Sequence, residues 1–209
     1  MNYFSLKFLF ILLLTFSSFS TFSSETSTKI LLIGDSLSAG YGLKQDQDWV
    51  HLLQNEYDAQ NKQITLINTA ISGQTTDNAI LKIDAWLEAH QPSHVLIELG
   101  GNDGIRGFPV SILQKHLTEL ITKSQAAGAK VAVMAIQIPP NLGPRYSKMF
   151  ADSYGKVTNE TNSYLMPYFM LDIAIEPSLM QDDNLHPNAK AQLIIRDFMS
   201  LEIDKWLQQ

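Results

Sequence analysis

The sequence predicts a three-layer α/β/α domain of flavodoxin-like type, in which helices cover both faces of a five-stranded, mainly parallel sheet. Two observations support this fold class. Short runs of apolar and β-branched residues recur along the chain, and each is almost wholly apolar, as expected of strands that are buried on both faces. Segments with the helical spacing of apolar residues separate these runs, and right-handed crossovers between them would make the sheet parallel.

The first residues predict a secretory signal peptide that is not part of this fold. Lys7 is the only charged residue before Glu25, the segment 8–16 is largely apolar, and a serine-rich tract follows at 17–24. The apolar segment is too short to span a bilayer securely. We therefore assign residues 1–24 to a leader with an approximate cleavage site, and residues 25–209 to one domain. An uncleaved N-terminal anchor is the alternative.

Composition excludes several classes of protein. The chain has no cysteine, which excludes disulfides and a lipid-modified cysteine. Loss of the leader would remove Lys7 and change the formal net charge from −6 to −7. So acidic a chain is a poor candidate for binding nucleic acid. The remaining ~185 residues suffice for a core that needs no disulfide or metal.

The elements can be placed in order along the chain. Strands are expected at 29–33, 64–69, 94–99, 130–136 and, as a shorter candidate, 168–170. An apolar stripe with Thr75 or Thr76 as N-cap predicts a helix after the second strand. This stripe consists of Ala79, Ile80, Ile83 and Leu87. The stripe of the expected last helix consists of Ala191, Ile194, Ile195, Phe198 and Leu201. The longest expected loops are 100–108 and 137–146, which follow strands at the sheet edge where open α/β sheets bind ligands.

Ser36 follows the first strand within the segment GDSLSAGYG, residues 34–42. A serine is a useful nucleophile only when it is exposed, rigidly held and within reach of a base, and the end of a buried strand meets the first two demands. The pattern also suits a helix N-cap, because Asp35, Ser36 and Ser38 are all good capping residues. A phosphate-binding turn is disfavoured, since no GxGxxG or GK[ST] motif is present.

Near the C-terminus, the segment 182–187, DDNLHP, brings two carboxylates and an imidazole together. An aspartate three residues before a histidine can accept a hydrogen bond from the ring and leave the second ring nitrogen free as a base. Asp183 and His186 have this spacing, and Pro187 suits the first turn of the last helix. Zinc is disfavoured, because no second histidine lies at ligand spacing. A solvated loop leading into the helix is the remaining alternative.

Two glycine-containing segments offer donors for a developing oxyanion. Gly73 follows the second strand and would let a backbone N–H approach a substrate, and Asn102 follows the third strand and carries a side-chain N–H. Ordinary turns have the same composition, so neither segment decides anything alone. With Ser36 and the pair of Asp183 and His186, however, they all fall at one edge of a parallel sheet. This convergence favours one active site.

These residues resemble, in order, the four sequence blocks of the GDSL or SGNH hydrolase family. The blocks are Gly34-Asp35-Ser36-Leu37, Gly73, Gly100-Gly101-Asn102-Asp103 and Asp183-Asn184-Leu185-His186. The resemblance spans roughly residues 29–207. The segments GDSLSAGYG, LGGNDGIRGF and MQDDNLHPNAKAQ are similar to a subgroup of periplasmic bacterial thioesterases that are also described as proteases and lysophospholipases. Gln74 departs from that subgroup, in which an acidic residue is expected.

The resemblance implies an SGNH hydrolase fold and a secreted serine esterase. Its substrates would be acyl thioesters and carboxylic esters, such as acyl-CoA-type thioesters, lysophospholipids and aryl esters. Ser36 would be the nucleophile, His186 the base and Asp183 the residue that orients His186. The backbone N–H groups of Ser36 and Gly73 and the side chain of Asn102 would form the oxyanion hole. No metal or cofactor is implied. The expected partners are small acyl substrates and not nucleic acid, and the expected protein is a periplasmic or secreted monomer without a membrane anchor after leader removal.

Two alternatives are open on the sequence. The same site could serve an O-acetylesterase acting on carbohydrate or cell-envelope polymer. The short loops favour instead an open groove for linear acyl chains, for which Ile105, Phe108, Ile138 and Leu142 are the candidate lining residues. A non-catalytic binding protein on the same scaffold is less favoured, because the serine, the histidine and both donors are present.

Overall fold

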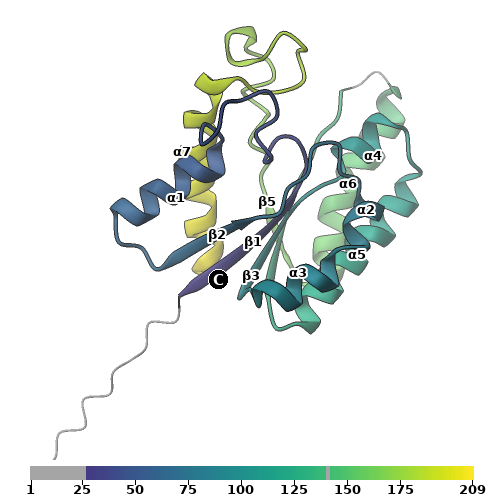
Figure 1. The fold of residues 1–209 in the computed structure, drawn as a ribbon. Helices are drawn as coiled ribbons and strands as arrows, with labels where there is room; N and C mark the ends of the chain where they lie inside the picture. The colour runs from purple at the N-terminus through teal and green to yellow at the C-terminus, as the bar shows by residue number, and fades with distance from the viewer. Residues whose placement is uncertain (1–26, 140–141) are drawn as a thin grey trace, which may run out of the picture.

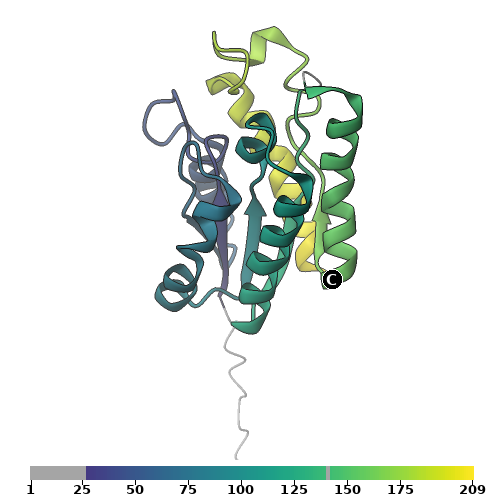
Figure 2. The ribbon, with the colours of Figure 1, turned by 90° about the vertical axis from the view of Figure 1, so that its right-hand side faces the viewer.

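The computed structural model describes residues 27–139 and 142–209. The predicted leader, 1–24, lies outside the described residues. The described chain forms a five-stranded sheet with helices on both faces (Figures 1 and 2). The α/β/α fold class predicted from the sequence is therefore confirmed. Within the described ranges, no helix is both long and apolar enough to cross a membrane.

The sheet has the strand order β2-β1-β3-β4-β5, and each neighbouring pair is parallel. The strands are β1 (Thr28–Gly34), β2 (Ile64–Asn68), β3 (His94–Glu98), β4 (Lys130–Met134) and β5 (Tyr164–Met166). After β2 the chain crosses over β1 and continues the sheet on its other side with β3. Ligands bind to open α/β sheets at such a switch point, outside the carboxyl ends of the strands. The loops after β1 and β3 therefore emerge side by side where a ligand is expected.

The predicted position of the last strand is wrong. It is Tyr164–Met166, whereas residues 168–170 form an irregular segment ending in a turn. Phe169 and Met170 are nevertheless buried. Hydrophobic composition alone cannot distinguish a short strand from a buried loop, which explains the error. The other four predicted strands are confirmed, although β2 and β3 each end one residue earlier than expected and β4 ends two residues earlier.

Helices cover both faces of the sheet. They are α1 (Trp49–Ala59), α2 (Thr76–Ile80), α3 (Ile83–His90), α4 (Gly101–Ile105), α5 (Val110–Ala126), α6 (Pro144–Thr161), the 3₁₀ helix η2 (Pro177–Leu179) and α7 (Ala189–Leu207). In Figure 1, α1 and α7 lie on one face, and α3, α5 and α6 lie on the other. The side chain of Asp48 caps α1, and that of Asn188 caps α7. Both caps accept two backbone N–H groups that a helix start leaves without partners.

Two helix predictions need correction. The stripe from Ala79 to Leu87 does not form one helix but the pair α2 and α3, which breaks after Ile80. Thr75 is the N-cap of α2, but its hydroxyl donates to Asp77 and makes no capping bond. The predicted apolar stripe of α7 is also partly wrong, because two of its members, Ile194 and Leu201, are 48 % and 64 % exposed.

The buried face of α7 is shifted around the helix relative to the predicted stripe. It runs through Ile195, Met199, Ile203 and Trp206. The apolar residues of α7 cover more than one face, and only packing selects the buried one. Pro187 precedes the N-cap and pairs with Met180, so it lies outside the first turn of the helix.

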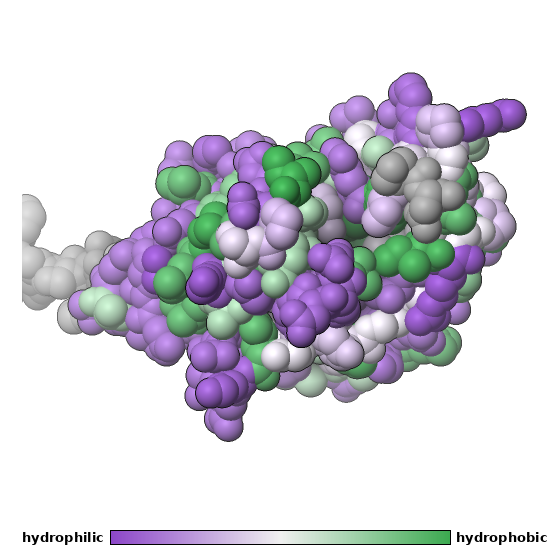
Figure 3. Space-filling model, turned by 90° about the horizontal axis from the view of Figure 1, so that it is seen from above, coloured by the Kyte–Doolittle hydropathy of each residue, from purple (hydrophilic) through white to green (hydrophobic). Residues whose placement is uncertain are grey.

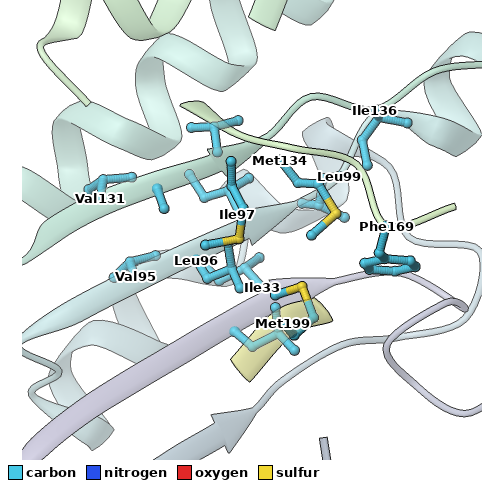
Figure 4. Close-up of a cluster of buried hydrophobic side chains, with 14 of the residues drawn as sticks. Ile33, Val95, Leu96, Ile97, Leu99, Val131, Met134, Ile136, Phe169 and Met199 are labelled. Atoms are coloured by element: carbon cyan, nitrogen blue, oxygen red, sulfur yellow. The ribbon is translucent and has the colours of Figure 1, made fainter. Parts of the chain in front are cut away.

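The hydrophobic core lies along the central strands and extends to their carboxyl ends. Figure 4 shows Ile33, Ile97 and Met134, which are fully buried, beside Leu99 and Phe169 from the segments that follow strands. Full burial of such a side chain stabilises a protein by about 1.5–3 kcal/mol. This packing holds the strand ends rigidly, and the loops that leave them start from fixed positions.

Gly100, which joins β3 to α4, has a backbone that only glycine adopts readily. Its φ is +115°, and a Cβ there would overlap the hydroxyl of Tyr154. Tyr154 is buried and donates a hydrogen bond to the carbonyl of Leu99 at 3.1 Å. The glycine therefore lets the chain turn tightly over a buried tyrosine directly before Asn102.

Replacing Gly100 with alanine should lower the free energy of unfolding by about 2–4 kcal/mol, because backbone strain and overpacking add. Gly128→Ala is a matched control: its φ is +87°, but no atom lies within 4 Å of the added Cβ. Strain alone predicts a loss of about 1 kcal/mol there. Urea unfolding of both variants measures the difference, and equal losses would contradict the predicted overlap with Tyr154.

Candidate active site

Ser36 lies in a tight turn at the end of β1. Residues 36–42 form successive turns, in which the N–H of Ala39 donates to the carbonyl of Asp35 at 2.9 Å. The Asp35 carboxylate accepts the N–H of Leu37 at 3.0 Å. Between residues 27 and 48 the structure has no α-helix, so the N-cap interpretation of Ser36 is wrong. The partly buried serine is held at the strand end by its neighbours' hydrogen bonds.

The segment from Asp183 to His186 folds back on itself. Asp183 Oδ1 accepts the N–H groups of Leu185 at 2.9 Å and His186 at 3.0 Å. Its other oxygen, Oδ2, lies 2.6 Å from His186 Nδ1. Asn184, between them, has a φ of +53°, a conformation that asparagine tolerates better than most residues. The carboxylate therefore holds both the loop and the orientation of the ring.

The structure brings Ser36 and His186 together across 150 residues of sequence. His186 Nε2 lies 2.9 Å from Ser36 Oγ. Asp183, His186 and Ser36 thus form one continuous row of hydrogen bonds. The side chain of His186 is only 12 % exposed, whereas that of Asp183 is 39 % exposed. Such a row can move a proton from the hydroxyl to the ring.

The pKa of Asp183 is lowered to about 2. Partial desolvation acts in the opposite direction, but the hydrogen bonds from the N–H and the ring of His186 and from the N–H of Leu185 outweigh it. The carboxylate therefore stays ionised well below neutral pH. A negative charge beside Nδ1 stabilises an imidazolium ring.

The two expected donor segments reach the same site. Gly73 has a φ of +77°, and Asn102 lies in the first turn of α4, within what the sequence predicted to be a loop. The Asn102 amide nitrogen donates to Asp35 Oδ2 and to the carbonyl of Gln74, both at 3.1 Å. Asp35 therefore connects the serine turn to Asn102. Gln74, the residue that departs from the expected subgroup, is buried and donates to the carbonyl of Gly34.

Sequence reasoning missed Glu98, the last residue of β3, which lies beneath the serine turn. Its Oε2 accepts the hydroxyl of Ser38 at 2.9 Å and the N–H of Asp35 at 3.3 Å. Burial, and next the charge of Asp35, raise the pKa of Glu98 well above its usual value. Burial also raises the pKa of Asp35 to about 6, against the opposing effects of the Leu37 N–H, His186 and Asn102. The available signal was a carboxylate ending an otherwise apolar strand.

A pocket of about 600 Å³ opens beside these groups. Ser36, Gly73, Asn102 and His186 all line it. Figure 3, which looks onto this end of the molecule, shows hydrophobic and hydrophilic patches side by side. The polar groups and an apolar wall therefore border the same space, as in many ligand sites.

The apolar wall of the pocket is only partly the predicted one. Ile105 and Ile138 line the pocket, whereas Phe108 and Leu142 do not. The segment before α7 supplies most of the other apolar lining, with Met170, Leu171, Ala174, Met180 and Leu185. Nothing in the local sequence of that segment signals a pocket, because its position depends on how it folds back over the sheet.

Comparison with known proteins assigns the chain to a family. Residues 32–194 match the model of the GDSL-like lipase/acylhydrolase family. The chain is 42 % identical over 185 residues to an arylesterase of Vibrio mimicus, covering 88 % of this chain and 92 % of that protein. It is 37 % identical over 198 residues to thioesterase 1/protease 1/lysophospholipase L1 of Escherichia coli K12, covering 95 % and 91 %.

Solved structures agree with this assignment. The psychrotrophic esterase EstA of Pseudoalteromonas sp. has a TM-score of 0.86 and 56 % identity, covering 87 % of this chain and 100 % of that one. An SGNH-hydrolase family esterase, AlinE4, has a TM-score of 0.71 and 30 % identity, covering 86 % and 96 %. The chain therefore belongs to the GDSL-like lipase/acylhydrolase family of ester-hydrolysing enzymes.

Proposed function

We propose that the protein is a secreted serine esterase that hydrolyses acyl thioesters and carboxylic esters through an acyl-enzyme on Ser36. The observation that carries this proposal is the row of hydrogen bonds from Asp183 through His186 to Ser36 Oγ, at one end of an apolar pocket. The names of the relatives, an arylesterase and a thioesterase/lysophospholipase, support both classes of substrate. A solved structure of the similar esterase EstA is described as inhibited by monoethylphosphonate, a kind of group that activated serines bind covalently.

The proposed reaction has two halves that use the same proton carrier. His186 Nε2 removes the proton of Ser36 Oγ while the oxygen attacks the carbonyl carbon of the substrate. When the tetrahedral intermediate collapses, the bond to the thiol or alcohol breaks, and His186 gives its proton to that leaving group. A water molecule then attacks the acyl-enzyme, His186 takes its proton, and that proton returns to Ser36 Oγ as the carboxylic acid leaves.

The oxyanion of each intermediate would bind between the backbone N–H groups of Ser36 and Gly73 and the side chain of Asn102. One such donor contributes about 3–4 kcal/mol to the stability of the transition state. In the free protein both hydrogens of the Asn102 amide are used, one on Asp35 and one on the carbonyl of Gln74. An oxyanion would have to take over or share one of these hydrogen bonds, while the other keeps the side chain in place beside the pocket.

The apolar wall supports acyl chains longer than acetyl as substrates. A wall that contains Met170, Leu171 and Met180 stabilises a bound alkyl chain by removing its surface from water. The alternative of an O-acetylesterase would leave most of this pocket unused. We place the site of action in the periplasm or outside the cell, and this part of the proposal rests on the leader-like composition of residues 1–24.

Ser36→Ala should lower kcat for a p-nitrophenyl ester by about 10³-fold or more, because no other group can form the acyl-enzyme. Circular dichroism and the melting temperature should stay close to those of the wild type. Ser111→Ala, at an exposed position on α5, is the matched control and should keep full activity. A fluorophosphonate probe should label the wild type and the control but not Ser36→Ala. Wild-type turnover by Ser36→Ala would refute the assignment of the nucleophile.

Asp183→Asn should lower kcat by about 10²- to 10⁴-fold, because the amide neither fixes the tautomer of His186 nor stabilises its charge. Asp182→Asn, one residue away on the exposed loop, is the control and should stay active. If Asp182→Asn were the inactive variant and Asp183→Asn were not, the roles would have to be exchanged.

The comparison of the wild type with Asp183→Asn also tests the pKa of Asp183. A carboxyl whose pKa is lowered from an unfolded value of about 3.9 stabilises the fold above that value, and the stabilisation is lost as the pH falls toward the folded pKa. The difference in melting temperature between wild type and Asp183→Asn should therefore be present at neutral pH and shrink between about pH 4 and the folded pKa of about 2. A difference that does not change over this window would contradict the lowered pKa.

Activity on p-nitrophenyl esters with acyl chains of about two to sixteen carbons should have its highest kcat/KM well above acetyl, since each buried methylene contributes about 0.8 kcal/mol. Leu171→Ser, on the apolar wall, should lower kcat/KM for long chains and leave that for acetyl unchanged. A sharp optimum at acetyl would refute the fatty-acyl assignment and favour the O-acetylesterase.

A further inference from the structure

The loops that hold Ser36 and His186 are joined by hydrogen bonds that run through Tyr41 and Gln181. The N–H of Tyr41 donates to the carbonyl of Ser36 at 3.2 Å, and the carbonyl of Tyr41 accepts from Gln181 Nε2 at 2.8 Å. The N–H of Gln181 in turn donates to the carbonyl of His186 at 2.8 Å. The connection therefore starts at the backbone of the serine and ends at the backbone of the histidine.

The amide of Gln181 uses both of its hydrogens in this connection. Besides the carbonyl of Tyr41, it donates to the carbonyl of Pro187 at 3.0 Å, so that this one side chain binds the backbone of the serine turn and the residue next to His186. Gly42 leaves room for this side chain, because a Cβ at Gly42 would overlap Gln181 Oε1. The turn after Tyr41 is thus shaped around the glutamine.

The ring of Tyr41 adds a second contact to the same histidine. Its centroid lies 4.3 Å from that of the His186 ring, with an angle of 35° between the planes. Contact with an aromatic face restricts the tilt of the imidazole, while the hydrogen bonds of Gln181 restrict the position of its backbone. The ring of Tyr41 and the amide of Gln181 thus restrain His186 in addition to Asp183.

Few hydrogen bonds join the two loops. Among the hydrogen bonds of the described residues, segments 35–43 and 178–188 are joined by the bond from Gln181 to Tyr41 and by the bond between Ser36 and His186 themselves. The Asn188 side chain donates to the carbonyls of Ser178 and Met180, and therefore stabilises the second segment only internally. Asp183 and its flanking residues are exposed, so the links to the serine turn are the bond of Gln181 to Tyr41, the contact of the Tyr41 ring with His186 and the bond of Ser36 to His186.

We propose that Gln181 is a positioning residue, which keeps His186 Nε2 within hydrogen-bonding distance of Ser36 Oγ. This inference rests on the proposed roles of Ser36 and His186 and adds a residue that acts through them. Misplacement of reacting groups by about 1 Å lowers rates by about 10²-fold. Gln181 lies outside the pocket wall, so its loss should act on the proton transfer and leave acyl binding unaffected.

Gln181→Met tests the proposal, because methionine has a similar length and cannot donate. We expect kcat to fall by about 10- to 100-fold, with KM within about two-fold of the wild type. The rate of labelling by a fluorophosphonate should fall by the same factor, since labelling also requires an activated Ser36. Gln54→Met is the matched control: Gln54 makes two comparable bonds to backbone, donating to Ile64 at 3.2 Å and accepting from Leu66 at 2.7 Å, at a distance from the site. It should keep kcat within about two-fold even if its melting temperature falls.

The proposal is overturned if Gln181→Met keeps the wild-type kcat, or if Gln54→Met loses as much activity at the same change in melting temperature. Should Gln181→Met fail to fold, Gln181→Glu takes its place, because an ionised carboxylate of the same length cannot donate either, and the same loss of kcat is then required. Failure of the proposed function is distinguishable, since Ser36→Ala would then remain active and the wild type would not be labelled. If Gln181 alone has no role, Ser36→Ala is inactive and Gln181→Met is active.

Discussion

The parallel pairing of β1 with β3 is the constraint on which the site depends. This pairing places Gly34 opposite Glu98, so the serine turn and the Asn102 helix leave the sheet at neighbouring points. The close approach is built into the backbone, because a Cβ at Gly34 would crowd the Glu98 carboxylate, and a Cβ at Gly100 would overlap Tyr154. Both glycines therefore allow the close packing at the strand ends, and this packing sets the positions of Ser36 and Asn102.

Beneath this edge, polar groups replace the apolar packing of the core. Glu98 accepts from Ser38 and from the backbone of Asp35, and Asp35 accepts from Asn102, so one network supports both the serine turn and a proposed oxyanion donor. Burying two carboxyl groups is unfavourable, and the pKa values of Asp35 and Glu98 are raised because burial disfavours their charged forms. This unfavourable burial gives the serine turn rigid support, and such unfavourable features are common at functional sites.

The attachment of the histidine is of a different kind. His186 belongs to no strand and lies in an exposed turn, ordered locally by Asp183 and placed against the serine turn by Gln181 and Tyr41. Ser36 and Asn102 are therefore fixed by the sheet, and His186 by a few polar and aromatic contacts. The chain between β5 and α7, which includes this turn, also carries much of the apolar pocket wall. This one connection therefore both positions the histidine and shapes the pocket.

The sequence alone determined the fold class, four of the five strands and the residues around which the site forms. Continuous apolar runs such as Ile30–Ile33 are characteristic of buried parallel strands. The motifs around Ser36, Gly73, Asn102 and His186 are short stretches of consecutive residues, so they can be recognised in the sequence without the fold. Only the tertiary structure decided the place of β5, the break between α2 and α3, the buried face of α7 and the hydrogen-bond partners of Glu98 and Gln181. These features depend on contacts between residues that lie far apart in the chain, such as Gln181 with Tyr41, and local composition carries no information about which distant backbone a side chain will meet.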